Sequence, residues 1–368
     1  MESIIVIKPD ALGDFILATP ALAQLRKKNP SALITLLASS RNIKIAKWSP
    51  DVDQVIEVPL FGMNAKNITA EYINETAFSL TKIIRHDQKS NSIGYLMRFD
   101  ADFYGASPLM YAMKIQKRIG YSESVLPRKS IINKGYDSFM TECIRDSCTE
   151  HEVIKNIRLI CESNPFKAAS ICLDRYETAL NSLKALDVLS RYKSNGNFLI
   201  LGIGASIASK KLESKFWIQL LQSINHRFDN IFIIGSEEDK IMANEIIVEC
   251  KHVSDLCGEL TPMEVFSFAK HSRLAICTDS FVKHVAAAAN VTTIELSAHT
   301  QLGNPNSEYG GIRFGAWGNK SYIVKPLNPL SGCTPDQCLS TSAHCISTIS
   351  IEDVINLVFK VLDDSLIY

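Results

Sequence analysis

The chain has 368 residues, of which 46% are hydrophobic and 21% are charged, with 39 basic and 39 acidic side chains. This length predicts two domains, and this composition is typical of a globular protein. The formal net charge of zero disfavours a long nucleic acid as partner, and the sequence contains no run of about 18 apolar residues that could span a membrane.

In the first half, short β-branched runs alternate with helical periodicity, a pattern that predicts βαβ units and a parallel sheet. Thr19-Pro20 interrupts the first helical pattern, so we expect a kink or a restart there. The predicted strands lie at residues 4–7, 33–37, 54–58 and 93–97.

A second alternating series begins at residues 198–202 and continues with strands at 231–234 and 274–277. Its predicted helices lie at residues 216–224, 239–249, 262–269 and 283–289. We therefore predict an α/β protein with two doubly wound, Rossmann-like domains facing a cleft. The predicted boundaries are 1–170 for the first domain, 171–348 for the second domain, and 349–368 for a final helix that packs back on the first domain.

The first predicted strand is followed by Lys8, Asp10, Gly13 and Asp14. Gly13 permits a left-handed or tightly turned backbone. Asp14 then lies near a helix start, where it is either a helix N-cap or a catalytic carboxylate. The local sequence alone favours the N-cap.

The strand at 274–277 leads into Thr278, Asp279 and Ser280 and then an alanine-rich helix. The start of such a helix directs backbone N–H groups at whatever lies beyond it, so we expect an anion site. His284, on the first turn, is either a buried core histidine or a ligand contact.

These motifs, taken together, resemble the bacterial heptosyltransferase family (glycosyltransferase family 9). The resemblance runs from Ile4 to about Val354 and rests on the order of the motifs. They are residues 5–22 around Gly13-Asp14, Arg118–Tyr121, Gly204–Ser206, Lys215–Trp217, Gly235–Glu238, Cys257-Gly258 and Asp279–Ala287.

The resemblance implies two facing domains of the GT-B type and an inverting transfer of heptose from an ADP-sugar to a growing lipopolysaccharide core. By position, Asp14 matches the catalytic base. The implied donor-binding residues are Gly204, Ser206, Lys215, Glu237, Glu238, Thr278, Asp279, Ser280, Phe281, Lys283 and His284. The implied acceptor-binding residues are Lys8, Asp10, Gly13 and Asp100.

This chemistry also follows from the residue types. An attacking hydroxyl needs a base to remove its proton, and a leaving diphosphate gains negative charge. Backbone N–H groups at 280–283 and the ammonium of Lys215 can stabilise that charge, so we predict no metal and no cofactor beyond the nucleotide-sugar.

The chain departs from the family at several positions. Phe281 stands where the family has glycine, and residues 207–214 form a small insertion. Ile218 replaces a proline that would only start a helix. The departure at Phe281 leaves two alternatives open: the same fold with another nucleotide-sugar, or a catalytically silent nucleotide-binding protein.

Two further enzyme classes are disfavoured. A nucleotide-sugar 2-epimerase would need acidic residues after the Asp-Ser turn, where this chain has Phe-Val-Lys-His. A nicotinamide dehydrogenase would need a third glycine after Gly202 and Gly204, where Ile207 stands. Asp100-Ala101-Asp102 imitates a metal-binding pair, but we interpret it as solvated or acceptor-facing.

The ten cysteines are mostly scattered, as in reduced proteins, and the first residues do not resemble a signal peptide. We therefore expect a cytoplasmic protein. A lipid-linked acceptor implies transient contact with the inner face of the inner membrane, through residues such as Lys114, Lys117 and Arg118. Cys333, Cys338 and Cys345, with His344, could bind zinc by ligand type. Their irregular spacing favours a loose thiol cluster or a local disulfide, so no metal is assigned.

Overall fold

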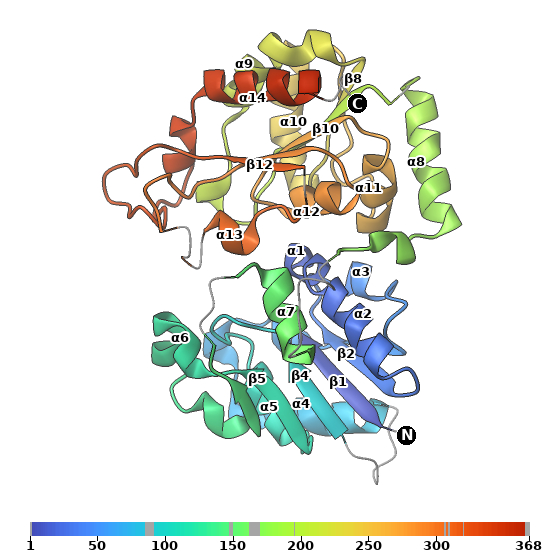
Figure 1. Ribbon diagram of the computed structural model, residues 1–368, viewed down its shortest axis with the longest axis vertical. Coiled ribbons are helices and arrows are strands. Elements are labelled where there is room, and N and C mark those ends of the chain that lie inside the picture. The colour runs from blue at the N-terminus through green and yellow to red at the C-terminus, as the bar shows by residue number, and fades with distance from the viewer. Residues whose placement is uncertain are drawn as a thin grey trace. The chain divides into compact units, whose positions relative to one another are not determined.

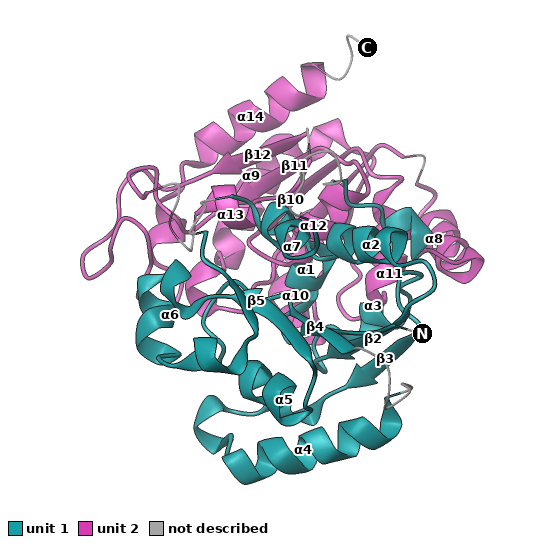
Figure 2. Cartoon of the chain, turned by 60° about the horizontal axis from the view of Figure 1, so that its bottom comes forward, with its two compact units in different colours: residues 1–176 teal, residues 177–368 magenta. Residues whose placement is uncertain are grey.

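The protein is described by a computed structural model that covers residues 2–84, 92–146, 150–161, 170–194, 196–304, 307, 310–318 and 320–364. The chain divides into two compact units, Met1–Tyr176 and Glu177–Tyr368 (Figure 2). The division falls after Tyr176, a few residues beyond the predicted boundary at 170.

The first unit contains one parallel sheet in the order β3-β2-β1-β4-β5-β6 (Figure 1). Its strands are β1 (Ser3–Lys8), β2 (Leu33–Ala38), β3 (Gln54–Glu57), β4 (Ser92–Leu96), β5 (Lys117–Tyr121) and β6 (Glu142–Ile144). Its helices are α1 (Leu12–Ile16), α2 (Thr19–Lys28), α3 (Ile43–Ala46), α4 (Ala70–Ile83), α5 (Ala106–Ala112), α6 (Pro127–Ile132) and α7 (Glu152–Ile160).

The centre of this sheet is β1, whose six residues are all buried. It pairs with β2 from Ser3↔Leu33 to Lys8↔Ala38, and with β4 on its other side. Helix contacts fall into two groups, α2 with α7 and α4 with α5. This arrangement covers both faces of the sheet, as expected for a continuous apolar strand. The predicted restart at Thr19-Pro20 is confirmed, because α1 ends at Ile16 and α2 begins at Thr19 with the proline in its first turn.

The second unit repeats this plan with a parallel sheet in the order β12-β11-β10-β7-β8-β9. Its strands are β7 (Phe198–Gly202), β8 (Asn230–Ile233), β9 (Val253–Asp255), β10 (Leu274–Thr278), β11 (Thr293–Leu296) and β12 (Ser321–Val324). Its helices are α8 (Ala179–Arg191), α9 (Ser214–Ile224), α10 (Lys240–Glu249), α11 (Pro262–Ala269), α12 (Phe281–Ala288), α13 (Gly311–Phe314) and α14 (Ile351–Asp364).

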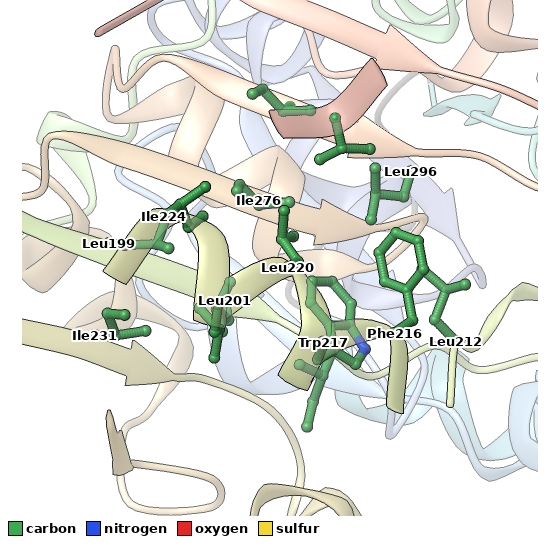
Figure 3. Packing of buried hydrophobic residues seen from close by; sticks show 14 of the residues in the cluster. Leu199, Leu201, Leu212, Phe216, Trp217, Leu220, Ile224, Ile231, Ile276 and Leu296 are labelled. Atoms are coloured by element: carbon green, nitrogen blue, oxygen red, sulfur yellow. The ribbon is translucent and has the colours of Figure 1, made fainter. Parts of the chain in front are cut away.

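The core of the second unit lies between its sheet and α9 (Figure 3). Trp217 is fully buried there and packs edge-to-face on Phe216. The last helix, α14, packs on α9 and places Val354 and Val358 in the same core. The expectation for this helix was packing against the first domain; the structure instead makes it part of the second unit.

In both sheets the strand order reverses once, between β1 and β4 in the first unit and between β7 and β10 in the second. Ligands of open parallel sheets bind beyond the carboxyl ends of the strands at such a switch point. The topology therefore predicts a ligand site at the carboxyl ends of β1 and β4 in the first unit, and at those of β7 and β10 in the second. No helix in the described part of the chain is long and apolar enough to cross a membrane.

Candidate functional site

In the first unit, the switch point carries a buried cluster of charges. Lys8 ends β1, Asp10 follows it, and Arg98 follows β4. Lys8 Nζ lies 2.8 Å from Asp10 Oδ2, and the Arg98 guanidinium pairs with the other oxygen of the same carboxylate. Lys8 also donates to the backbone oxygen of Met97 at 2.9 Å. The predicted acceptor residues Lys8 and Asp10 are thus brought together, but they mainly bind each other.

The charges in this cluster hold one another ionised. Burial alone would raise the pKa of Asp10, but the positive charges of Arg98 and Lys8 outweigh it and lower that pKa. Burial alone would lower the pKa of Lys8, but the Asp10 carboxylate raises it. Asp10 is therefore a fixed negative charge at the carboxyl end of β1.

Asp14 lies in the first turn of α1, after an N-cap at Ala11, and no side chain caps this helix. The N-cap interpretation of Asp14 is therefore wrong. Gly13 is the second residue of α1 and has no positive φ, so the left-handed conformation that glycine permits is not adopted here. Burial, followed by the negative charge of Asp10, raises the pKa of Asp14 to about 6. A carboxyl with such a pKa is suited to accept a proton near neutral pH.

The prediction that Asp100-Ala101-Asp102 is solvated or acceptor-facing is wrong on solvation for Asp102 alone. Asp102 is buried, and its carboxylate accepts hydrogen bonds from the backbone N–H groups of Ala106 and Ser107 at 3.2 and 2.7 Å. It therefore fixes the start of α5, while Asp100 is half-buried. Lys129 is a buried cation that the sequence analysis missed. Burial lowers the pKa of Lys129 to about 8, and its ammonium donates to the backbone oxygens of Phe99 and Tyr121.

In the second unit, Thr278 connects the two strands at the switch point through hydrogen bonds. Its hydroxyl donates to the backbone oxygens of Gly204 at 2.6 Å and Gly202 at 3.2 Å, which joins the ends of β10 and β7. A Cβ on Gly202 would lie 2.9 Å from Cys277 Sγ and 3.0 Å from Val282 Cβ. Glycine here lets α12 pack closely on the sheet. The role of Thr278 is thus structural.

Asp279, the next residue, stands between two lysines. Lys283 Nζ lies 2.5 Å from Asp279 and 2.8 Å from Glu295, and Lys210 pairs with the other oxygen of Asp279. Burial would raise the pKa of Asp279, but Lys283 and Lys210 outweigh it and hold that pKa far below its ordinary value. Lys283 was predicted to bind the donor, yet its side chain has no exposed area. The cation of this cluster that has exposed area is Lys210, which the sequence analysis missed.

The start of α12 has no side-chain cap. Ser280 is the N-cap in an extended conformation, and its buried Oγ has no hydrogen-bond partner among the described residues. The first-turn N–H groups of α12 have no side-chain cap from Ser280, and the anion site at this helix start stays a prediction. Phe281 is half-buried at the first helical position, and His284 is 6% exposed. That burial fits the core-histidine alternative.

A cavity of about 70 Å³ opens at this edge of the second unit. Asp279 is the predicted donor residue that lines it, together with Lys210 and His299, which follows β11. Burial, helped by the charge of Lys325, lowers the pKa of His299, so this imidazole is neutral. The other lining residues are Ile207, Ser209, Ser297, Ala298, Asp336, Gln337 and Cys338.

His299 could have been found from the sequence, because it stands shortly after the apolar run at residues 291–296, as Asp279 stands shortly after the strand predicted at 274–277. Lys210 gave no such signal. It comes from the 207–214 insertion, and only the tertiary structure brings it to Asp279.

The remaining predicted donor residues do not line this cavity. Ser206 and Lys215 are exposed, as is Glu238. Glu237 is exposed and pairs with Lys240 at 2.7 Å. The next residue along the chain, Asp239, is buried with Lys211 Nζ 3.0 Å away, and its carboxylate occupies the space that a Cβ on Gly204 would need. This contact explains the glycine at 204 without a dinucleotide.

The curated relatives and the solved structures agree with this fold. The chain is 23% identical over 299 residues to lipopolysaccharide heptosyltransferase 3 of Escherichia coli, a match that spans 78% of this chain and 81% of that protein. A shorter match to a Haemophilus influenzae protein is 45% identical over 56 residues and spans only 16% of that protein.

Among solved structures, a family 9 glycosyltransferase from Veillonella parvula matches with a TM-score of 0.74 and 18% identity, over 98% of this chain and 97% of that one. The ADP-heptose lipopolysaccharide heptosyltransferase II of Escherichia coli matches with a TM-score of 0.68 and 15% identity, over 99% of each chain. These likenesses confirm the predicted GT-B fold. The sequence profile of glycosyltransferase family 9 (heptosyltransferase) matches residues 102–324, more than half of the chain. The chain therefore belongs to glycosyltransferase family 9, as a heptosyltransferase-like member of that family.

Proposed function

We propose that this protein transfers a heptose, or a closely related sugar, from an ADP-activated donor to a lipopolysaccharide core or related surface glycan, with inversion at the anomeric carbon. The family and the names of the relatives support the sugar and the acceptor. The observation that carries the proposal is Asp14, whose pKa of about 6 belongs to a carboxyl at the switch point of a parallel sheet.

In the proposed reaction, the Asp14 carboxylate takes the proton of an acceptor hydroxyl. The hydroxyl oxygen forms a bond to the anomeric carbon as the bond from that carbon to the diphosphate oxygen breaks, and ADP leaves with the electron pair. The transition state has oxocarbenium character. Asp10 acts on Asp14 from a distance, because its permanent negative charge keeps the pKa of Asp14 high.

The proposed diphosphate site is the start of α12 together with Lys210. Backbone N–H groups at 280–283 and an ammonium supply charge where the leaving group becomes more negative, so the departure needs no metal ion. Lys210 takes the role that the residue types first suggested for Lys215. Lys215 is exposed on the first turn of α9, outside the cavity lining.

A second candidate keeps the reaction and changes the donor. Phe281 places a bulky side chain at the first position of α12, where the family has glycine, and it is half-buried. A different nucleotide-sugar would then fit the site better. Calorimetric titration with ADP-, UDP- and GDP-sugars separates the two candidates, and tighter binding of a UDP- or GDP-sugar rejects the ADP-heptose assignment.

The proposal also includes a lipid-linked acceptor and transient contact with the cytoplasmic face of the inner membrane. The three predicted contact residues differ in the structure. Lys117 pairs with Glu142 at 2.9 Å, and Arg118 donates inward to the backbone oxygen of Phe139. Lys114 is exposed beside a 610 Å³ hollow that it lines with Tyr111. Sedimentation with anionic lipid vesicles should weaken in Lys114→Glu; equal binding by parent and variant rejects this surface.

The direct test of the activity uses the purified chain, ADP-heptose and a truncated core lipid. We expect mass spectrometry to show the lipid gaining one heptose. Binding of ADP without transfer from any donor would instead support the catalytically silent alternative.

A further inference from the structure

The long segment after β12 brings four metal-ligating side chains together. Cys333, Cys338, His344 and Cys345 each offer one ligand atom, and these atoms all lie within 4.8 Å of one another. The sequence analysis assigned no metal here because the spacing along the chain is irregular. The structure removes that objection, since coordination depends on where the side chains meet.

The distances fit one tetrahedral ion. With Zn–S near 2.3 Å and Zn–N near 2.0–2.1 Å, ligands on a tetrahedron lie about 3.8 Å apart for two sulfurs and about 3.6 Å for sulfur and nitrogen. Cys333 Sγ lies 3.7 Å from Cys338 Sγ, and His344 Nδ1 lies 3.3, 3.8 and 3.7 Å from Cys333, Cys338 and Cys345. A disulfide would need about 2.05 Å between sulfurs, and all three cysteines are free.

The backbone supports the sulfurs as it does in metal sites. The N–H of Leu339 donates to Cys333 Sγ at 3.3 Å, and the N–H of Leu330 donates to Cys345 Sγ at 3.4 Å. Such bonds stabilise negative charge on sulfur and fix the direction of each ligand. Cys345 is fully buried, and Cys333, Cys338 and His344 are half-buried, so the cluster is partly shielded from water.

The segment that carries these ligands has no regular secondary structure to hold it in place. Residues 325–344, all described, contain no helix and no strand. Structureless loops of this length are uncommon in compact domains without something that orders them. The segment is nevertheless attached at its end, where Ile346 enters the core of the second unit.

We propose that these four residues bind one structural transition-metal ion, with Zn²⁺ the ion that the ligands fit best. Thiolate and imidazole ligands in a closed tetrahedral set favour zinc, and four protein ligands leave no position open for a substrate. The ion is therefore structural and takes no part in the chemistry.

The site would hold one wall of the donor cavity. Asp336, Gln337 and Cys338 line that cavity, and the neighbouring Pro335 accepts a hydrogen bond from the hydroxyl of Thr300 at 2.8 Å. The 3₁₀ turn at Cys345–Thr348 packs on the turn at Ala208–Lys210, which carries the partner of Asp279. This positioning role rests on the proposed function, whereas the existence of the metal site does not.

The first test is the metal content of the purified full-length chain, measured by elemental mass spectrometry. We expect about one zinc ion per chain in the parent, and loss of that zinc in Cys338→Ser and His344→Ala. Cys172→Ser, which removes an exposed free cysteine outside the cluster, should keep the zinc. His344→Cys should keep it too, because four thiolates also form a zinc site.

If the variants fail to fold, native mass spectrometry of the parent chain still shows whether a metal ion is bound. A parent chain without bound metal, or one linked by a disulfide between Cys333 and Cys338, would overturn the proposal. One equivalent of iron, lost in the same variants, would support the site and overturn the choice of zinc.

ADP affinity tests separately whether the metal site positions the wall of the cavity. Misplacing a binding group by about 1 Å can cost on the order of 10²-fold in rate. We therefore expect ADP to bind at least about tenfold more weakly after the metal is removed by a chelator and to recover when Zn²⁺ is added back. Unchanged ADP affinity in demonstrably metal-free, folded protein would overturn that role, while failure of either form to bind ADP would count against the proposed function.

Discussion

Asp14 has an unfavourable position for a charged side chain, because burial and the neighbouring Asp10 raise its pKa from the ordinary 3.8 to about 6. The folded protein therefore holds this proton more tightly than the unfolded chain does. The resulting stabilisation is complete below about pH 4 and is lost as pH rises through about 6. At neutral pH the ionised carboxylate thus makes the fold less stable, as is common for catalytic groups.

Asp14→Asn should therefore stabilise the protein at neutral pH. The pKa shift corresponds to at most about 3 kcal/mol, and partial exposure reduces the expected gain to about 1–2 kcal/mol. Thermal melts between pH 4.5 and 8 should show the variant melting higher at pH 8, with the difference shrinking toward pH 4.5. A variant that melts lower than the parent at pH 8 would mean that Asp14 stabilises the fold.

Asp10→Asn should have the opposite effect on stability. It leaves Lys8 and Arg98 buried without their shared carboxylate, which typically costs about 3–5 kcal/mol. It should also lower the pKa of Asp14, so the acid limb of the pH–rate profile should move to lower pH. Glu142→Gln is the matched control, because its pair with Lys117 is half-exposed and should contribute under about 1 kcal/mol.

A double variant allows the effect of Asp10 to be measured if the single variant fails to fold. Asp10→Asn combined with Lys8→Met removes one of the two unpaired cations and should recover part of the lost stability. An acid limb that stays in place in Asp10→Asn would contradict the proposed action of Asp10 on Asp14.

At the scale of elements, Lys283 fixes α12 through its ion pairs with Asp279 and Glu295, whereas Lys210 is the cation of the proposed diphosphate site. Lys283→Met should destabilise the protein by about 3–5 kcal/mol, because Glu295 would remain as a buried acid without its cation. Lys210→Met should change stability little and weaken ADP binding by about 10–100-fold, the usual value of a charged hydrogen bond. Chemical denaturation and calorimetry on both variants check this, and equal ADP affinity in Lys210→Met and the parent would remove Lys210 from the diphosphate site.

The central elements could be predicted from the sequence, because buried strands and helices require recognisable runs or periodic patterns of apolar residues. β7 and α11 have the predicted bounds, and β1, β4 and β10 differ by a residue or so at their ends. The strands absent from the prediction lie at a sheet edge or next to one: β5, β6, β9, β11 and β12. β6 has three residues and none is fully buried, so it carries no continuous apolar run.

Site residues near the central strands could likewise be predicted, whereas those contributed by distant segments could not. Asp279 directly follows β10 and Asp14 lies in the helix that follows β1, and topology alone predicts ligands beyond the ends of these central strands. Arg98, Lys210 and Lys211 could not be predicted, because they reach the carboxylates of Asp10, Asp279 and Asp239 from segments distant along the chain. Lys283 was placed in the right segment, but its direction was not evident: its side chain turns inward to Glu295.

At the scale of the whole molecule, each unit repeats one strand order and supplies a different part of the proposed reaction. The proposed base, Asp14, lies in Met1–Tyr176, and the proposed diphosphate site lies in Glu177–Tyr368. Variants in the two units should therefore have separable effects. Asp14→Asn should lower kcat and leave the Kd of ADP unchanged, whereas Lys210→Met should raise that Kd and leave the apparent pKa of the pH–rate profile unchanged. Coupled changes in both quantities for each variant would contradict this division of labour.

The most direct test of Asp14 as the base is the pH dependence of kcat/KM for sugar transfer in the parent and in Asp14→Asn. The parent should rise with pH through an apparent pKa near 6, because the carboxylate must be ionised to accept the proton. Asp14→Asn should transfer about 10²–10⁴-fold more slowly and lose that rise. A folded Asp14→Asn protein that works within a few-fold of the parent and keeps the same acid limb would contradict the account.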